Sequence, residues 1–519
     1  MSARHPPSRD ALIVFAAALV ALAAGLVALS PAPVGVFWDD AVYVITGKAL
    51  ATGAGYRYIH LPGAPAATHY PPLWPAVLSL VWRALPQFPD NVRTMKLLNP
   101  LFLAIAAAGA TMLAVRAARV AAWLAAVVVA AASAVAPVLL LSAVLMSEPM
   151  CLALTAAAVA FATMMIMRGR PRDGLIAGAL VGLSILTRSA ALVLLPALAV
   201  GLLWRRSRRA SALALAVALV CIAPWFVWSA RHAHELPPVL AGSYGPYTSW
   251  VLDAYRAQPG LMWEVARQNT VGALHDSGVV LFGGLPPAMR VWFVPPLLVL
   301  TLAGLAMAGR RAAALSVTLV CYAILIVVWP YPPGRFMWAL FPLYAVGALV
   351  ATATIARRFR RRMSGRVARA TSIVAMAFAA ATLLMVVRYD ARGMQRGWYK
   401  TAIETNADGM VGPVGWIARN TAPTDTIATD VHLLAYLYAG RIAVPVNSLT
   451  VDEDVHGKTD AQMRKEFAAI DSTFHPRFWV ITGMVPERFA FAKWASEPGS
   501  PFVFAPLPGD GIAAKVNRR

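Results

Sequence analysis

The sequence predicts a polytopic α-helical membrane protein with a small C-terminal α/β domain. Of its 519 residues, 59% are hydrophobic and only 13% are charged, and the mean hydropathy is +0.63. Soluble domains average about 25% charged residues, so about half of the expected charge is missing. The three cysteines each lie in an apolar run, which excludes a disulfide scaffold and indicates buried thiols.

The net charge of +22 lies entirely in the part of the chain before residue 389. Residues 389–519 contain 14 basic and 14 acidic residues, whereas the preceding part contains 32 basic and 10 acidic residues. The basic residues come in short bursts between apolar runs, for example at 205–209 and 357–362. Such bursts are typical of cytoplasmic loops that set membrane topology, and they do not indicate nucleic-acid binding.

Nine apolar runs approach the roughly 20 residues that a membrane-spanning helix needs. They cover residues 11–29, 97–115, 120–141, 149–167, 210–228, 291–308, 312–329, 336–356 and 370–387. The first run follows Arg4 and Arg9 and is longer than the apolar core of a signal peptide. We therefore expect an uncleaved first helix that enters the membrane from the cytoplasm.

Two shorter apolar segments need separate treatment. Basic bursts flank residues 174–204 on both sides, which predicts a tight hairpin with Arg188 at its outer tip. Residues 73–85 follow a proline pair and are too short to span, so we expect a helix at the outer interface. This gives about eleven crossings in the inner or plasma membrane, with a cytoplasmic N-terminus and an extracytoplasmic C-terminal domain.

The predicted domains are a transmembrane domain at 1–388, with outer loops at 30–96 and 229–290, and an extracytoplasmic domain at 389–519. Helical and strand-like segments alternate in the second domain, which is typical of a small α/β fold. These segments lie at 416–420, 426–430, 433–438, 442–446, 462–470 and 478–482. A lid or an acceptor-recognition module is the simplest role for this domain.

Three acidic residues lie at the outer ends of predicted spans. Asp39 and Asp40 follow the first span, and Glu148 lies at the turn between two later runs. Ionisable groups at membrane depth are costly and by default indicate function. Each could instead cap a helix, Asp39 or Asp40 the one beginning at Ala41 and Glu148 the one beginning at Pro149. The residues alone leave both interpretations open.

Several short sequence motifs contain or follow these acidic residues along the chain. They are FWDDAVY at 37–43, GKAL at 47–50, HYPPLW at 69–74, MSEP at 146–149, GL and LTR within 182–188, PW at 224–225, and RF and FPL within 335–343. Together they resemble the GT-C glycosyltransferases, which include the protein O-mannosyltransferases and the bacterial lipid A aminoarabinose transferase. The resemblance extends from residue 1 to about 390 and implies a GT-C-like fold.

The resemblance implies transfer of a sugar from a polyprenyl-phosphate carrier to an acceptor hydroxyl at the outer face, with inversion. The acceptor would be a cell-envelope glycolipid, a polysaccharide or a protein. Asp39 matches the catalytic acidic position of the family, Asp40 stands where the family often has Glu, and Glu148 matches the second acidic position. Asp40, Glu148 and His69 are also the candidate ligands of a divalent metal ion, although no recognised ligand spacing supports one.

The chemistry of such a transfer accounts for the other candidate residues. An acceptor hydroxyl needs a base, and a phosphate leaving group needs cations rather than a general acid. The candidate cations are Arg335, Arg188, Lys48 and Arg57, and Tyr70 is a further candidate for donor binding. Arg335 could instead snorkel to the membrane interface.

Two other functions remain open at this stage. A transporter or lipid flippase would use the same outer charges, and it predicts discontinuous helices near mid-membrane and an internal repeat. A GT-C-like assembly factor without catalytic activity would keep the fold alone. Only an assay separates the last of these from an enzyme.

Overall fold

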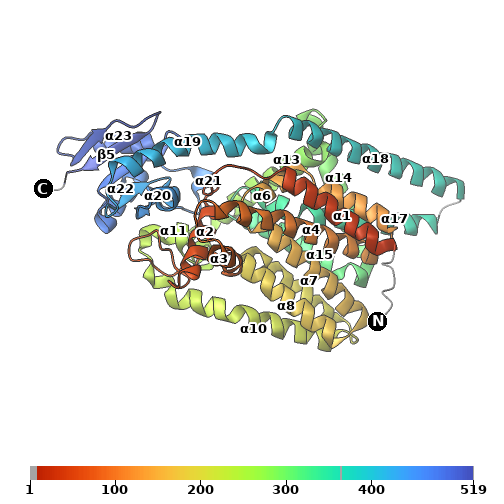
Figure 1. The fold of residues 1–519 in the computed structure, drawn as a ribbon. Coiled ribbons are helices and arrows are strands. Elements are labelled where there is room, and N and C mark those ends of the chain that lie inside the picture. The colour runs from red at the N-terminus through yellow and green to blue at the C-terminus, as the bar shows by residue number, and fades with distance from the viewer. Residues whose placement is uncertain (1–8, 363–364, 518–519) are drawn as a thin grey trace. The chain divides into compact units, whose positions relative to one another are not determined.

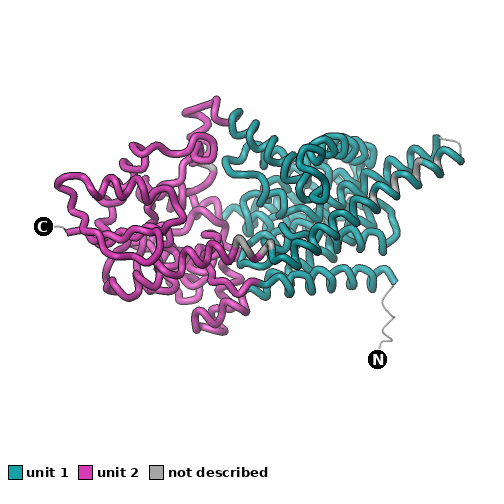
Figure 2. Tube along the Cα trace, turned by 90° about the horizontal axis from the view of Figure 1, so that it is seen from above, with its two compact units in different colours: residues 1–29, 96–224, 263–399 teal, residues 30–95, 225–262, 400–519 magenta. Residues whose placement is uncertain are grey.

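The computed structural model describes residues 9–362 and 365–517 and divides the chain into two compact units (Figure 2). Unit 1 comprises residues 1–29, 96–224 and 263–399, and unit 2 comprises 30–95, 225–262 and 400–519. Most of the two predicted outer loops therefore belongs to the same unit as the C-terminal domain. Four of the five boundaries between the units fall inside helices, namely α4, α10, α13 and α19, whose bounds are given below.

In the described part of the chain, five helices are long and apolar enough to cross a membrane. They are α1 (Arg9–Val27), α4 (Asn91–Ala118), α7 (Glu148–Arg168), α10 (Arg208–His232) and α14 (Pro287–Ala308) (Figure 1). Two bent helix pairs raise this number to seven if each pair is one span. The 16-residue α15 (Ala313–Val328) and the 31-residue α18 (Gly365–Gln395) cover most of two other predicted runs. A polytopic helical protein is confirmed, whereas the number of eleven crossings stays a prediction.

Two runs predicted as continuous spans are broken helices, so that part of the prediction is wrong. The run at 120–141 forms α5 (Ala122–Ser133) and α6 (Ala136–Ala143), which are bent by 63°. The run at 336–356 forms α16 (Pro333–Ala339) and α17 (Phe341–Arg360), bent by 67°. Pro137 and Pro342 lie in the first turn of the second helix of each pair. A proline ring there clashes with the preceding turn, so the first helix cannot continue.

The predicted turn at Arg188 is confirmed. Helix α8 (Pro171–Thr187) ends there because Arg188 adopts an extended conformation, with φ −150° and ψ 130°. The chain returns through short helices rather than one continuous arm: η1 (Ser189–Val193), α9 (Leu194–Ala199) and η2 (Val200–Leu203). Helices α7 and α8 lie side by side along most of their length (Figure 1).

A stripe of glycines lets α8 contact α10 backbone to backbone. A Cβ atom at Gly174 would lie 2.3 Å from the carbonyl oxygen of Ala210, and one at Gly178 would lie 2.3 Å from that of Ala214. No other residue fits at this distance without moving a helix. This is the small-residue packing by which membrane helices approach closely.

Unit 2 begins with α2 (Asp39–Ala51) and α3 (Leu73–Ala84), which pack on each other. The 12 residues of α3 are too few to span a bilayer, as predicted. The second outer segment is largely helical: η3 (Ala233–Glu235), η4 (Pro238–Leu240), α11 (Ala241–Tyr244) and α12 (Tyr247–Ala257). Helix α13 (Pro259–Phe282) follows, in a region that was predicted as an outer loop. The short helix η5 (Gly309–Arg311) belongs to unit 1.

The C-terminal part of unit 2 is an α/β fold, as predicted. Its strands are β1 (Ile427–Thr429), β2 (Ala443–Val444), β3 (Phe478–Ile481), β4 (Phe502–Ala505) and β5 (Ile512–Val516), in the order β2-β1-β3-β5-β4. The first three are parallel, with Ile427 opposite Ala443 and Phe478, and β5 is antiparallel to both neighbours. The associated helices are α19 (Trp398–Asn420), α20 (His432–Ala439), α21 (Glu453–His456), α22 (Asp460–Phe474) and α23 (Glu487–Ala495). Trp479 stacks on Phe491 in the core between sheet and helices.

Candidate functional site

In unit 1, two arginines converge on the buried carboxylate of Glu148. Arg335 Nε donates to Glu148 Oε1 at 2.8 Å, and an Nη atom of Arg188 lies 2.9 Å from Oε2. The side chain of Glu148 is only 2% exposed, whereas that of Arg335 is 30% exposed. Two cations face one anion, so the cluster keeps a net charge of about +1.

The elements that carry these side chains explain their positions. Glu148 is the first residue of α7, Arg188 lies where α8 ends, and Arg335 lies on the short α16 after a helix break. Arg188 also donates to Ser147 Oγ at 2.9 Å. The capping interpretation of Glu148 is not supported, because α7 begins at Glu148 itself and its carboxylate binds guanidinium groups. The same pairing replaces the snorkelling interpretation of Arg335.

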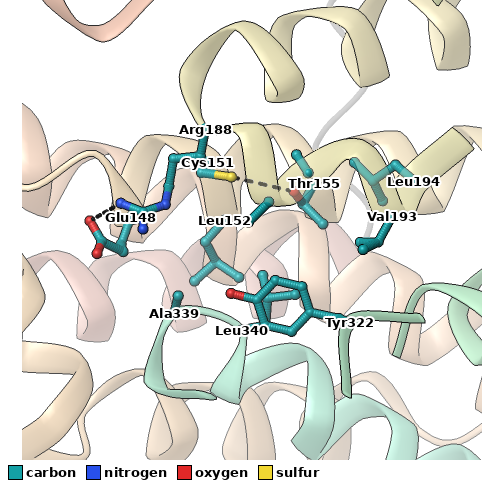
Figure 3. Close-up of a pocket in the computed structure, with 12 residues that line it drawn as sticks. Glu148, Cys151, Leu152, Thr155, Arg188, Val193, Leu194, Tyr322, Ala339 and Leu340 are labelled. Atoms are coloured by element: carbon teal, nitrogen blue, oxygen red, sulfur yellow. Dashed lines mark hydrogen bonds and ion pairs between the residues drawn. The ribbon is translucent and has the colours of Figure 1, made fainter. Parts of the chain in front are cut away.

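A small pocket adjoins this cluster and runs away from its charged end (Figure 3). Glu148 and Arg188 lie at one end, and Val193 and Leu194 lie at the other. Most of the remaining lining is apolar, and the polar exceptions are Cys151, Thr155 and Tyr322. The pocket therefore combines a cationic end with an apolar wall.

In unit 2, Asp39 is paired with a tyrosine. The hydroxyl of Tyr70 donates to Asp39 Oδ1 at 2.6 Å. The rings of Tyr43 and His69 pack edge-on against Tyr70, with centroids 5.0 and 4.7 Å away. Burial and the neighbouring carboxylate raise the pKa of Tyr70 well above its usual value, so the hydroxyl keeps its proton and can donate. Asp39 is the first residue of α2 and is half-buried.

Asp40 has a different environment. Its carboxylate accepts from the backbone N–H groups of Gly35, at 2.8 Å, and of Phe37, at 3.3 Å, and the residue is 1% exposed. Asp40 thus holds the preceding loop rather than capping α2. The resemblance left the division of labour between the two aspartates open, and these contacts give Asp40 a structural role.

Lys48 and Arg57, predicted to bind phosphate, have partners within unit 2. Lys48 Nζ lies 4.9 Å from the ring centre of Tyr436 and 5.7 Å from that of Trp82, and partial burial lowers its pKa. Arg57 donates to the carbonyl oxygen of Ala64 at 3.0 Å and lies 3.6 Å from Glu235. Both contacts tie loops and helices of this unit together.

The three predicted metal ligands have other partners. His69 Nδ1 lies 2.6 Å from the carbonyl oxygen of Gly245, so this nitrogen donates, and burial lowers the pKa of His69 to about 4. Asp40 binds backbone amides and Glu148 binds arginines. Within residues 9–362 and 365–517, no group of three or more His, Cys, Asp or Glu is arranged to hold a metal ion. A divalent ion stays a prediction that these contacts do not favour.

Sequence reasoning missed a buried network of two histidines and a tyrosine. The hydroxyl of Tyr244 lies 2.9 Å from His60 Nε2 and 2.5 Å from His432 Nε2. All three residues are fully buried, and burial lowers the pKa of both histidines, that of His432 to about 3. The three residues come from the two outer segments and from the C-terminal domain, and no local motif connects them.

Comparison with known proteins identifies the fold of the chain. No protein-family model and no curated protein sequence matches the chain. Solved structures do match it, among them two of ArnT from Cupriavidus metallidurans. The structure bound to undecaprenyl phosphate has 17% identity and a TM-score of 0.52, and the structure in the apo state has 15% identity and a TM-score of 0.54. Each match covers 97% of both chains. The chain therefore has the GT-C fold of these structures along almost its whole length.

Proposed function

We propose that this GT-C-fold membrane protein is a glycosyltransferase that moves a sugar from a polyprenyl-phosphate-linked donor to an acceptor hydroxyl. The acceptor is a cell-envelope glycolipid, polysaccharide or protein at the extracytoplasmic face, and the anomeric carbon is inverted. The observation that carries the proposal is the convergence of Arg188 and Arg335 on buried Glu148. It is supported by the fold, since one structure of this fold is of ArnT bound to undecaprenyl phosphate.

The arginine cluster suits a phosphate that becomes more negative as it leaves. When the bond between the anomeric carbon and the phosphate oxygen breaks, the electron pair stays on that oxygen. Guanidinium groups that are already oriented stabilise this charge without reorganising during the reaction. Glu148 supplies the orientation, because it holds Arg188 and Arg335 in charge-assisted contacts before any donor binds.

Asp39 is the proposed base. The acceptor oxygen attacks the anomeric carbon from the face opposite the phosphate, and its proton passes to the carboxylate of Asp39. The products are the glycosylated acceptor and free polyprenyl phosphate. The phosphate gains one negative charge when its bond to the sugar breaks, and the acceptor hydroxyl gives up one proton, so the overall charge is unchanged. Tyr70 holds the carboxylate in one orientation through its hydrogen bond to Oδ1.

A transporter or flippase is the second candidate, and one observation favours it. The two broken helix pairs, bent by 63° and 67°, are the discontinuous helices that this hypothesis predicts. Such breaks are also tolerated wherever irregular backbone is buried in protein or lines a cavity. The similarity to ArnT over 97% of the chain favours the enzyme.

The test uses the full chain in lipid nanodiscs with a panel of polyprenyl-phosphate sugars. Wild type and the control Arg256→Ala, at an exposed surface arginine, should release polyprenyl phosphate, and Arg335→Ala should release it much more slowly. Movement of the labelled lipid across vesicles without release of polyprenyl phosphate would favour the transporter. No consumption of any donor, with or without added envelope lipids, would favour the inactive assembly factor.

A further inference from the structure

The residue before the proposed base has a strained backbone. Trp38 has φ 60° and ψ −66°, and the N–H of Asp39 donates to the carbonyl oxygen of Phe37 at 2.6 Å. These angles and this bond define the non-inverse γ-turn, which is rare and strained. A bulky residue keeps such a conformation only when its surroundings hold it there.

Two rings hold the side chain of Trp38. The ring of His432 meets it edge-on, with centroids 4.5 Å apart, and the ring of Tyr244 lies 6.0 Å away. His432 is the first residue of α20 in the C-terminal domain, and Tyr244 is the last residue of α11 in the second outer segment. We name Tyr244 and His432 the ring clamp.

The ring clamp is itself fixed by hydrogen bonds. The hydroxyl of Tyr244 lies between His432 Nε2 and His60 Nε2, and since it has one proton it donates to one histidine and accepts from the other. Tyr58 and Thr68 donate to the carbonyl oxygen of Tyr244 at 3.2 and 3.1 Å. The clamp therefore has little freedom to move away from Trp38.

We propose that His432 and Tyr244 are positioning residues for the transfer reaction, because they hold Trp38 in the γ-turn that places the Asp39 carboxylate. The inference rests on the proposed function of Asp39 as the base. It gives the C-terminal domain a part in catalysis that needs no contact with the sugar or the acceptor. The domain acts through a ring contact on the residue next to Asp39.

Three substitutions at residue 432 separate the ring from the hydrogen bond. His432→Phe keeps a ring against Trp38, His432→Gln keeps a polar group for Tyr244, and His432→Ala keeps neither. We expect kcat to fall about tenfold to a hundredfold in the Ala and Gln variants, with KM for the donor unchanged. The Phe variant should recover most of the wild-type kcat.

A double-mutant cycle tests whether His432 acts through Trp38. In Trp38→Gly, glycine can adopt the turn without strain but offers no ring, so adding His432→Ala should change kcat less than about twofold. Phe491→Leu, in the core of the C-terminal sheet, is the matched control: it should lower the Tm and leave kcat of the folded protein unchanged.

The outcomes separate this inference from the proposed function. Inactive wild type would overturn both, and normal activity of Asp39→Asn would remove the base on which the inference depends. If wild type is active and Asp39→Asn is not, then normal kcat in His432→Ala, or additive effects in the cycle, would overturn the ring clamp alone. Loss of kcat with recovery in His432→Phe supports it.

Discussion

The hydroxyl of Tyr70 donates to Asp39 Oδ1 across 2.6 Å, although these two residues belong to different sequence motifs and lie 31 positions apart. Asp39 begins α2, whereas Tyr70 precedes the proline pair that leads into α3. The packing of α2 on α3 brings them together. The pair is the basis of the first two predictions.

Asp39→Asn should reduce sugar transfer about a hundredfold or more, because the amide cannot take the acceptor's proton. The fold should survive, since Asn has the same size and can still accept from Tyr70. The measurement is kcat for release of polyprenyl phosphate, with elution volume and Tm as controls. Near-normal transfer by the folded variant would sink the catalytic assignment of Asp39.

Tyr70→Phe should shift the acid limb of the pH–rate profile to higher pH. The hydrogen bond from Tyr70 stabilises the ionised carboxylate, so its loss makes Asp39 easier to protonate, and a protonated base is inactive. The measurement is kcat from pH 4.5 to 8.5. Tyr331→Phe, at a tyrosine of unit 1, serves as the control and should leave the profile in place. An unshifted acid limb in Tyr70→Phe would contradict the role given to this hydroxyl.

Arg335→Ala should weaken binding of polyprenyl phosphate about tenfold to a hundredfold, the value of one charge-assisted contact. Arg335→Lys should recover only part of the affinity, because an ammonium cannot reproduce a bidentate guanidinium. Direct binding in nanodiscs measures both, with Arg256→Ala as the control. An Ala variant that binds as tightly as wild type would return Arg335 to the snorkelling interpretation.

Acid should destabilise unit 2 through its buried histidines. The folded pKa of His69 is lowered to about 4 and that of His432 to about 3, both by burial, whereas an unfolded histidine titrates near 6.5. Below pH 6.5 the unfolded chain binds protons that the folded chain does not. The free energy of unfolding is therefore highest above pH 6.5. As the pH falls from 6.5 toward 4, each of these histidines lowers it by up to about 1.4 kcal/mol per pH unit.

The measurement is Tm from pH 8 to 4.5. His432→Phe removes one titrating group and should flatten the pH dependence, whereas His475→Asn, at an exposed position, should not. Equal slopes in wild type and His432→Phe would show that His432 is not buried in its neutral form.

The N-terminus should be cytoplasmic and the C-terminal domain extracytoplasmic, because only this orientation places the basic bursts inside. The test is labelling of single cysteines in intact cells with an impermeant reagent. Ser472→Cys, exposed near the end of α22, should be labelled, and Ser364→Cys, which lies outside the described residues, should be protected. The reverse pattern would invert the topology.

Hydropathy and short sequence motifs predicted the features that depend on residues close together in the sequence. The long apolar helices, the turn at Arg188, and strands β1 to β3 all follow local patterns. The helix breaks near Pro137 and Pro342 were missed because the apolar runs continue through them. Strands β4 and β5 were not predicted, although they are no shorter than β1 to β3, because no segment after residue 482 was assigned.

The site shows the same division. The resemblance to GT-C glycosyltransferases identified Asp39, Glu148 and Arg335 as candidate site residues from the short motifs that contain them. Their partners could not be predicted, because Glu148 and Arg335 are 187 residues apart, and the apolar spans between them carry no signal for which pair meets. His60 and Tyr244 are 184 residues apart, and no local motif marks either of them. Contacts of this kind come from tertiary packing alone.

The glycine stripe on α8 makes the charged cluster sensitive to changes far from it. Gly178 lies ten residues before Arg188, which is about 15 Å along a helix at 1.5 Å per residue. A substitution to alanine there adds one methyl group, yet its carbon would meet the Ala214 carbonyl oxygen at 2.3 Å, so α8 must tilt or slide. A small tilt of α8 about Gly178 produces a larger displacement of the Arg188 guanidinium at the end of the helix. Among natural variants of this chain, a conservative exchange of glycine in α8 would thus displace Arg188 without changing any residue of the charged cluster.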